Sequence, residues 1–280
     1  MSESNSLNSD IKSMKLYRHV DRVLTELQYL GKSERETLSA SELTPFDQLH
    51  YHGTESVDEA VRATGITAGS LVLEIGSGLG GPARHIAATV GAKVTALELQ
   101  NDQNELASHL SARCDLAGKV AHVCGDFLTH EWSTRHFDVI VSWLALYHIP
   151  KRSVLLERCY NLLQKGGYFF TEDLYARKEF TDSERSELAT ELFANCLPDY
   201  DTDLQDLKTA GFELVSTEEM SDDWTAFAGE RLAAYRAQKA RHIDIHGEAV
   251  FIAMEHFYDV VVRHFAGGKL GGIRIVARKT

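Results

Sequence analysis

Residues 71–81 read LVLEIGSGLGG, and this stretch decides the fold class. The first five residues are aliphatic apart from Glu74, which is typical of a short buried strand. Glycines follow at once, and a helical stretch runs from Pro82 to Val90. Glycine adopts positive φ and lets a ligand approach the backbone, and a helix start offers free N–H groups to an anion. The stretch therefore predicts a strand, a ligand-binding turn and a helix.

Short apolar runs alternate with helical stretches beyond this turn. Such alternation is typical of βαβ units, in which helices cover both faces of a parallel sheet. The runs show no polar alternation, as expected for strands buried on both faces. We expect strands at 93–98, 120–124, 137–142 and 168–172, with helices at 101–117 and 151–163. We also expect strands at 212–217 and 273–277 and helical stretches at 15–40 and 224–265.

An acidic residue accompanies the glycine turn. Glu98 ends the second predicted strand, 22 residues after Gly76, and an acid at this position can bind both hydroxyls of a ribose. Gly76, Gly78 and Gly81 also spell GxGxxG, which is the pattern of a dinucleotide site. Two ligands therefore fit the turn, a nicotinamide or flavin dinucleotide and S-adenosylmethionine.

Three further residues favour S-adenosylmethionine. A carboxylate at Glu74 would repel a pyrophosphate, whereas it can receive an ammonium group. Asp126 and Phe127 follow the third predicted strand, where the carboxylate can accept from an adenine amino group and the ring can pack on the base.

These motifs, with Phe137–Ile140 and Leu162–Gly167, resemble the class I S-adenosylmethionine-dependent methyltransferases over about residues 56–175. The resemblance implies an α/β fold with a Rossmann-like, seven-stranded, mostly parallel sheet whose last strand is antiparallel. We expect a helical N-terminal cap at 1–55, a cofactor-binding core at 56–175, and a remainder at 176–280 that completes the sheet and adds a helical lid. The implied cofactor contacts are Glu74, Gly76, Gly78, Gly80, Glu98, Leu99, Asp126, Phe127 and Ser142.

Four segments resemble the sarcosine/dimethylglycine and phosphoethanolamine N-methyltransferases more closely: LEIGSGLGGPARHIA, SWLALYHI, SDDW and AGGKLGG. This resemblance implies methyl transfer to the nitrogen of an amine or amino acid. Those families carry Asp where this chain has Leu144, so a phosphobase acceptor is in doubt. The alternatives are O- or C-methylation of a natural product or lipid-like molecule, a dinucleotide-dependent oxidoreductase, and a cofactor-binding regulator without activity.

His148 is the predicted catalytic base, because it follows the fourth predicted strand at the edge where ligands bind in open α/β sheets. The alternative is a histidine that packs or orients the lid. Tyr51 is the second predicted catalytic residue, with packing against the sheet as its alternative. The predicted substrate contacts are His52, Trp143, Tyr147, Asp173, Tyr175 and Trp224.

Composition limits the partners. The net charge of −12 repels phosphate backbones, so we expect a small-molecule acceptor and no nucleic acid. The four cysteines form no CxxC pair, the N-terminus has no signal-peptide pattern, and no apolar run is long enough to span a bilayer. These features predict a cytoplasmic protein, and the sequence does not indicate its oligomeric state. His242 and His246 have metal-ligand spacing but lack an evident third ligand, so no metal is expected.

Overall fold

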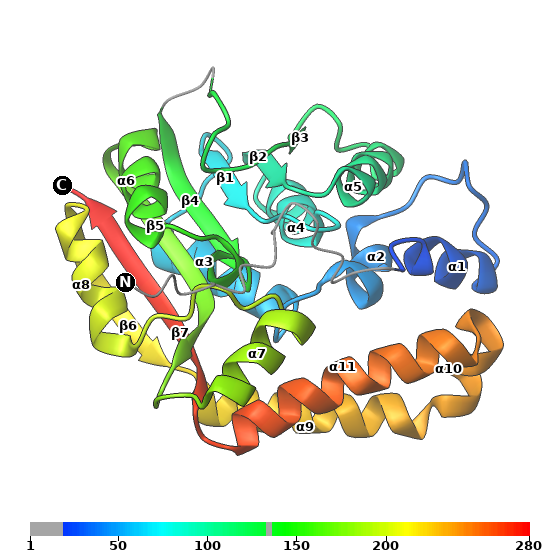
Figure 1. Ribbon diagram of the computed structural model, residues 1–280. Helices are drawn as coiled ribbons and strands as arrows, with labels where there is room; N and C mark the ends of the chain where they lie inside the picture. Colours follow the sequence, from blue (N-terminus) through cyan, green and yellow to red (C-terminus); the bar gives the residue numbers. More distant parts are fainter. Residues whose placement is uncertain (1–18, 133–135) are drawn as a thin grey trace.

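The fold is a seven-stranded mixed sheet with helices on both faces and a helical layer over one edge (Figure 1). The computed structural model describes residues 19–132 and 136–280. The strand order is β3-β2-β1-β4-β5-β7-β6, in which β7 alone runs in the direction opposite to the other six strands. The strands are β1 (Leu71–Ile75), β2 (Lys93–Glu98), β3 (Val120–Cys124), β4 (Phe137–Trp143), β5 (Leu163–Ala176), β6 (Phe212–Glu219) and β7 (Leu270–Lys279). The predicted fold class is confirmed.

Two helical layers bury the faces of this sheet. On one face, α3 (Thr54–Thr64) and α4 (Gly81–Thr89) pack Val57 and Ile86 against the strands. On the other, α6 (Arg152–Leu162) and α8 (Tyr200–Thr209) bury Leu156 and Leu207. Helix α5 (Asn101–Arg113) connects β2 to β3 and packs against both strands. Because β1, β2 and β4 are parallel, their carboxyl ends meet at the edge where ligands bind in such sheets.

A second group of helices covers that edge. The helices are α1 (Arg22–Tyr29), α2 (Ala40–Asp47), α7 (Asp182–Glu191), α9 (Ser221–Ala237), α10 (Lys239–His246) and α11 (Glu248–Ala266). The expected single stretch at 224–265 is three helices, because Gly247 has φ +85 between α10 and α11 and a break at Gln238 ends α9. No helix in the described part of the chain is long and apolar enough to cross a membrane.

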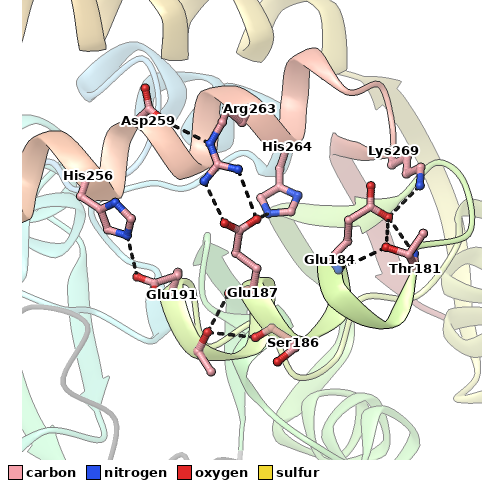
Figure 2. A network of polar contacts seen from close by, with 11 residues as sticks. Thr181, Glu184, Ser186, Glu187, Glu191, His256, Asp259, Arg263, His264 and Lys269 are labelled. Atoms are coloured by element: carbon pink, nitrogen blue, oxygen red, sulfur yellow. Dashed lines mark hydrogen bonds and ion pairs between the residues drawn. The ribbon is translucent and has the colours of Figure 1, made fainter.

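Ion pairs fasten α7 to α11 (Figure 2). Glu184, Glu187 and Glu191 recur at helical spacing along one side of α7, and each meets a basic side chain of α11 or of the turn after it. The pairs are Glu184–Lys269 at 2.7 Å, Glu187–Arg263 at 2.8 Å, Glu187–His264 at 2.9 Å and Glu191–His256 at 3.3 Å. Exposed pairs of this kind add little stability individually, but together they set the position of α7 over the carboxyl edge.

Candidate functional site

The turn between β1 and α4 is shaped by its glycines. Gly76, Gly78 and Gly80 have φ values of +73, +51 and +74, a region that side chains with a Cβ rarely adopt. A Cβ on Gly76 would lie 2.3 Å from the Cβ of Ala145, which follows β4. The turn therefore lies so close to the loop after β4 that only glycine fits at position 76. Helix α4 begins directly after Gly80.

A cavity of about 480 Å³ lies between this turn and the ends of the neighbouring strands. Its volume is in the range of small-molecule sites. It brings together nine of the predicted site residues, which come from four separate stretches of the chain. They are Glu74, Gly76, Gly78, Glu98, Leu99, Asp126, Phe127, Trp143 and His148.

Two buried carboxyl groups flank the turn. Burial raises the pKa of Glu74 to about 8, against the opposing charge of Arg84, and one of its carboxyl oxygens has no hydrogen-bond partner. Burial also raises the pKa of Glu98, whose two oxygens accept from the backbone N–H groups of Gly78 at 2.9 Å and Gln100 at 2.8 Å. Glu74 lines the cavity and has one buried oxygen without a partner, so its carboxyl group can accept from a cationic ligand group.

His148 is held as a neutral imidazole. Its Nδ1 lies 3.0 Å from the carbonyl oxygen of Phe193. A carbonyl can only accept, so Nδ1 carries the proton and donates, which leaves the lone pair on Nε2. Burial lowers the pKa of His148 to about 4. Its side chain therefore stays uncharged at neutral pH and can accept a proton only from a strong acid.

A second histidine of the cavity was missed by the sequence analysis. His50 lines the cavity, and its Nε2 donates to the carbonyl oxygen of Gly53 at 2.9 Å. Burial lowers its pKa to about 4. The predicted contact His52 lies outside the cavity lining and binds Asp223 of α9 at 2.6 Å. Nothing in the pattern HYH, which continues no strand or helix, distinguishes the two histidines.

Five more predicted residues lie outside the lining of this cavity, and their contacts differ. Ser142 donates to the carbonyl of Ile75, and Tyr175 donates to Glu219. Asp173 lies 3.9 Å from Arg152, and burial raises its pKa to about 7. Trp224 is fully buried, and Gly80 is the N-cap of α4. The predicted roles of these residues stay predictions.

Tyr51 and Tyr147 line a separate chamber of about 40 Å³ between β5, α9 and α11. Leu144 lines both this chamber and the cofactor-sized cavity, so the two are neighbours. Arg231 also lines the chamber, with its guanidinium 5.6 Å from the centroid of the Tyr51 ring. The chamber thus already contains a cation next to an aromatic ring.

The sequence analysis also missed a buried ion pair, of which one member lines the cavity. Arg84 is fully buried and donates to Asp47 at 2.8 Å and to the carbonyl of Leu79. Asp47 lines the cavity from α2, whereas Arg84 belongs to the helix after the glycine turn. An arginine among small and apolar residues in α4 signals a buried partner, but 37 positions separate the two residues.

A group of potential metal ligands lies away from the cavity. Glu26 of α1 joins His242 and His246 of α10, with ligand atoms within 4.8 Å of one another. The expectation that no third ligand accompanies the two histidines is wrong, because α1 packs against α10. Glu26 of α1 and Arg241 of α10 are 215 positions apart in the chain. Arg241 already binds the Glu26 carboxylate at 2.5 Å, so a metal ion would compete with this guanidinium. The absence of a metal stays a prediction.

Comparison with known proteins agrees with this site. Residues 72–167 match the model of a family described as a methyltransferase domain. The chain carries a methyltransferase domain. The domain covers the glycine turn, Glu98, the loop after β3 and His148. The predicted resemblance to the class I S-adenosylmethionine-dependent methyltransferases is therefore confirmed for this domain.

Individual relatives differ in their acceptors. The sterol 24-C-methyltransferase of Saccharomyces cerevisiae is 29% identical over 165 residues, which are 57% of this chain and 43% of that protein. The chain thus matches less than half the length of this curated relative. A putative sarcosine dimethylglycine methyltransferase from Galdieria sulphuraria has a TM-score of 0.70 at 18% identity, covering 81% of this chain and 84% of that chain. Phosphoethanolamine N-methyltransferase 2 of Haemonchus contortus, in complex with S-adenosyl-L-methionine, has a TM-score of 0.77 at 17% identity, covering 90% and 59%. These structures share the fold.

Proposed function

We propose that the chain is an S-adenosylmethionine-dependent methyltransferase that methylates carbon in a largely apolar small molecule. The observation that supports S-adenosylmethionine as the methyl donor is the unpartnered oxygen of Glu74, which is buried beside the glycine turn. A zwitterionic sulfonium nucleoside has an ammonium group for this oxygen, whereas a dinucleotide has a pyrophosphate that a carboxylate repels. The methyltransferase domain supports the same donor.

The residues of the cavity divide the cofactor between them. Glu74 would hold the ammonium, and the positive-φ turn at Gly76 lets the methionine part of the cofactor approach the backbone. Glu98 would hold the ribose hydroxyls with the lone pairs that its backbone contacts leave free. Asp126 and Phe127 would hold the adenine. When bound, S-adenosylmethionine supplies an electrophilic methyl group.

The electrostatics of the acceptor side favour carbon as the nucleophile. A base works best when its pKa lies near the operating pH, and burial holds His148 at about 4. Such a base removes a proton poorly from an ammonium group. It suffices for a carbocation, the species left on an alkene after it takes up a methyl group, because the adjacent C–H bond is strongly acidic. That proton passes to Nε2 of His148 while the C–H electron pair forms the new double bond.

The predicted amine acceptor fits this site less well. An ammonium group in the small chamber that contains Tyr51 would share it with the guanidinium of Arg231, which lies 5.6 Å from the centroid of the Tyr51 ring. Two like charges in a chamber of about 40 Å³ oppose each other. A sterol 24-C-methyltransferase relative, in contrast, is named for transfer to carbon. We therefore propose carbon, and we also propose the predicted cytoplasmic location.

Product analysis tests the proposal. The full chain is incubated with S-adenosylmethionine labelled in its methyl group and two acceptor pools, an apolar lipid extract and a set of polar amines that includes sarcosine. We expect the label in apolar products, and we expect NMR to show that the labelled methyl group is bound to carbon. The Glu74→Gln variant should not transfer this label. Label confined to the amines would overturn the carbon proposal. Equilibrium binding of NAD without binding of S-adenosylmethionine would overturn the methyltransferase proposal itself.

A further inference from the structure

A second cavity of about 410 Å³ lies between α1, α2, α7 and α11. Most of its wall is apolar, with Val23, Phe46, Phe193 and Met254 on different sides. Its volume lies in the range of small-molecule sites, and its mainly apolar lining is also typical of such sites. Neither the cofactor motifs nor the methyltransferase domain at 72–167 accounts for this cavity, because most of its lining comes from helices outside that segment.

Single side chains separate this cavity from the cofactor-sized cavity and the small chamber, which together form the proposed transfer site. Leu49 lines the second cavity, the cofactor-sized cavity and the small chamber that contains Tyr51. Phe257 of α11 lines the second cavity and the same chamber. Rotation of a leucine side chain costs little, so Leu49 can open a continuous path from the second cavity to the transfer site. Phe193 gives a further link, since its side chain lines the second cavity while its carbonyl oxygen holds His148.

The wall of the second cavity contains a basic group suited to an oxygen-bearing ligand. Arg22 lines it in a half-buried position, and within residues 19–132 and 136–280 its guanidinium makes no ion pair. The wall also contains His19 and the pair Glu191 and His256, whose side chains lie 3.3 Å apart and bind each other. A guanidinium is a donor only, so the ligand group that satisfies Arg22 has to supply acceptor oxygens.

We propose that the second cavity holds the body of the methyl acceptor, and that this acceptor is an elongated apolar molecule with an oxygen-bearing end group at Arg22. Its reactive end passes Leu49 into the transfer site. The proposal rests on the proposed methyl transfer and adds the size, polarity and orientation of the acceptor. A hydroxyl and a carboxylate offer the same acceptor oxygen, and binding experiments with both distinguish them.

Direct binding of two simple probes tests the cavity without turnover. Equilibrium dialysis measures the affinity of the full chain for labelled dodecanoate and dodecan-1-ol, and calorimetry measures the affinity for S-adenosylhomocysteine. The variants Met254→Trp on α11 and Thr190→Trp on α7 introduce a large side chain at the cavity lining from two different helices. The matched control is Ile252→Trp, on the same helix as Met254 but 57% exposed.

We expect both filling variants to weaken probe binding by about tenfold or more while S-adenosylhomocysteine affinity and the unfolding temperature stay within the range of the Ile252→Trp control. Arg22→Gln should weaken dodecanoate by about tenfold or more and dodecan-1-ol much less, because only the carboxylate loses an ion pair with the guanidinium. An equal loss for both probes assigns Arg22 to the hydroxyl and carboxylate alike.

Wild-type probe affinity in both folded filling variants would overturn the proposal, and so would a failure of the wild-type chain to bind either probe. Failure of the proposed methyl transfer has a different signature. In that case S-adenosylhomocysteine does not bind, or no acceptor is methylated, while the probes still bind and the filling variants still weaken their binding.

Discussion

Replacement of Glu74 by glutamine tests the chemistry of the cofactor site most directly. The pKa of Glu74 is raised from 4.5 to about 8, chiefly by burial. One pKa unit corresponds to 1.36 kcal/mol, so ionising this group in the empty cavity costs about 5 kcal/mol. Near pH 6.5 only about 3% of the free protein carries the carboxylate that an ammonium group requires. Glutamine has the same shape but no charge, so it removes this linkage and keeps the packing.

The sign of the pH effect follows from proton counting. Binding of an ammonium group selects ionised Glu74, so a proton is released on binding at pH values below the pKa. Affinity for S-adenosylhomocysteine should therefore rise by up to about tenfold per pH unit between pH 5.5 and 7.5. In Glu74→Gln this rise disappears. At pH 8 the variant should bind about tenfold to a hundredfold more weakly, because it lacks a charged hydrogen bond.

Stability gives an independent measurement of the same group. The raised pKa means that folded Glu74 keeps its proton at pH values where the unfolded chain has lost it. Its contribution to the free energy of unfolding therefore falls as pH rises from 4.5 to 8, by up to about 5 kcal/mol, and Glu74→Gln removes this decline. Urea unfolding across that range measures the difference.

Isothermal titration calorimetry in buffers of different ionisation enthalpy counts the released proton. Glu55→Gln is the matched control, because Glu55 is exposed on α3 and lies outside the cavity lining. A pH slope that persists in Glu74→Gln would refute the reasoning and assign the slope to another group, of which Glu98 is the nearest with a raised pKa.

Three other predictions follow from the same geometry. His148→Asn should lower turnover by about tenfold to a thousandfold with S-adenosylhomocysteine affinity unchanged, whereas wild-type turnover should show no titration of His148 between pH 6 and 9, since its pKa is about 4; unchanged turnover would exclude it as the base. Gly76→Ala should destabilise the chain by about 1–3 kcal/mol in urea unfolding, because its Cβ would lie 2.3 Å from that of Ala145 and its φ is +73; a smaller effect would mean that the loop after β4 yields. Asp47→Asn should cost about 3–5 kcal/mol by leaving Arg84 buried and unpaired, and the double variant with Arg84→Met should recover part of that loss; additive losses in the double variant would contradict a paired role.

Local sequence determined the nucleotide-binding half of the molecule. The strand at 71–75, the glycine turn and the acid at Glu98 are close in the chain, and parallel βαβ connections bring successive strand ends to one edge. For that reason Glu74, Gly76, Asp126 and His148 line one cavity, as their motifs predicted. These positions depend on backbone rules that operate within about 30 residues, which a single sequence displays.

Tertiary packing alone decided the side of the site that we propose for the acceptor. His50 rather than His52 faces the cavity because of how the segment after α2 lies on β4, with the His50 ring 5.6 Å from that of Trp143. Arg22 and Met254 line the same cavity because α1 packs against α10, more than 200 residues later in the chain. The pKa values near 4 and 8 likewise arise from desolvation by distant segments. Contacts between segments far apart in the chain leave no periodic signal in the sequence, and they set the shape and charge of the side proposed for the acceptor.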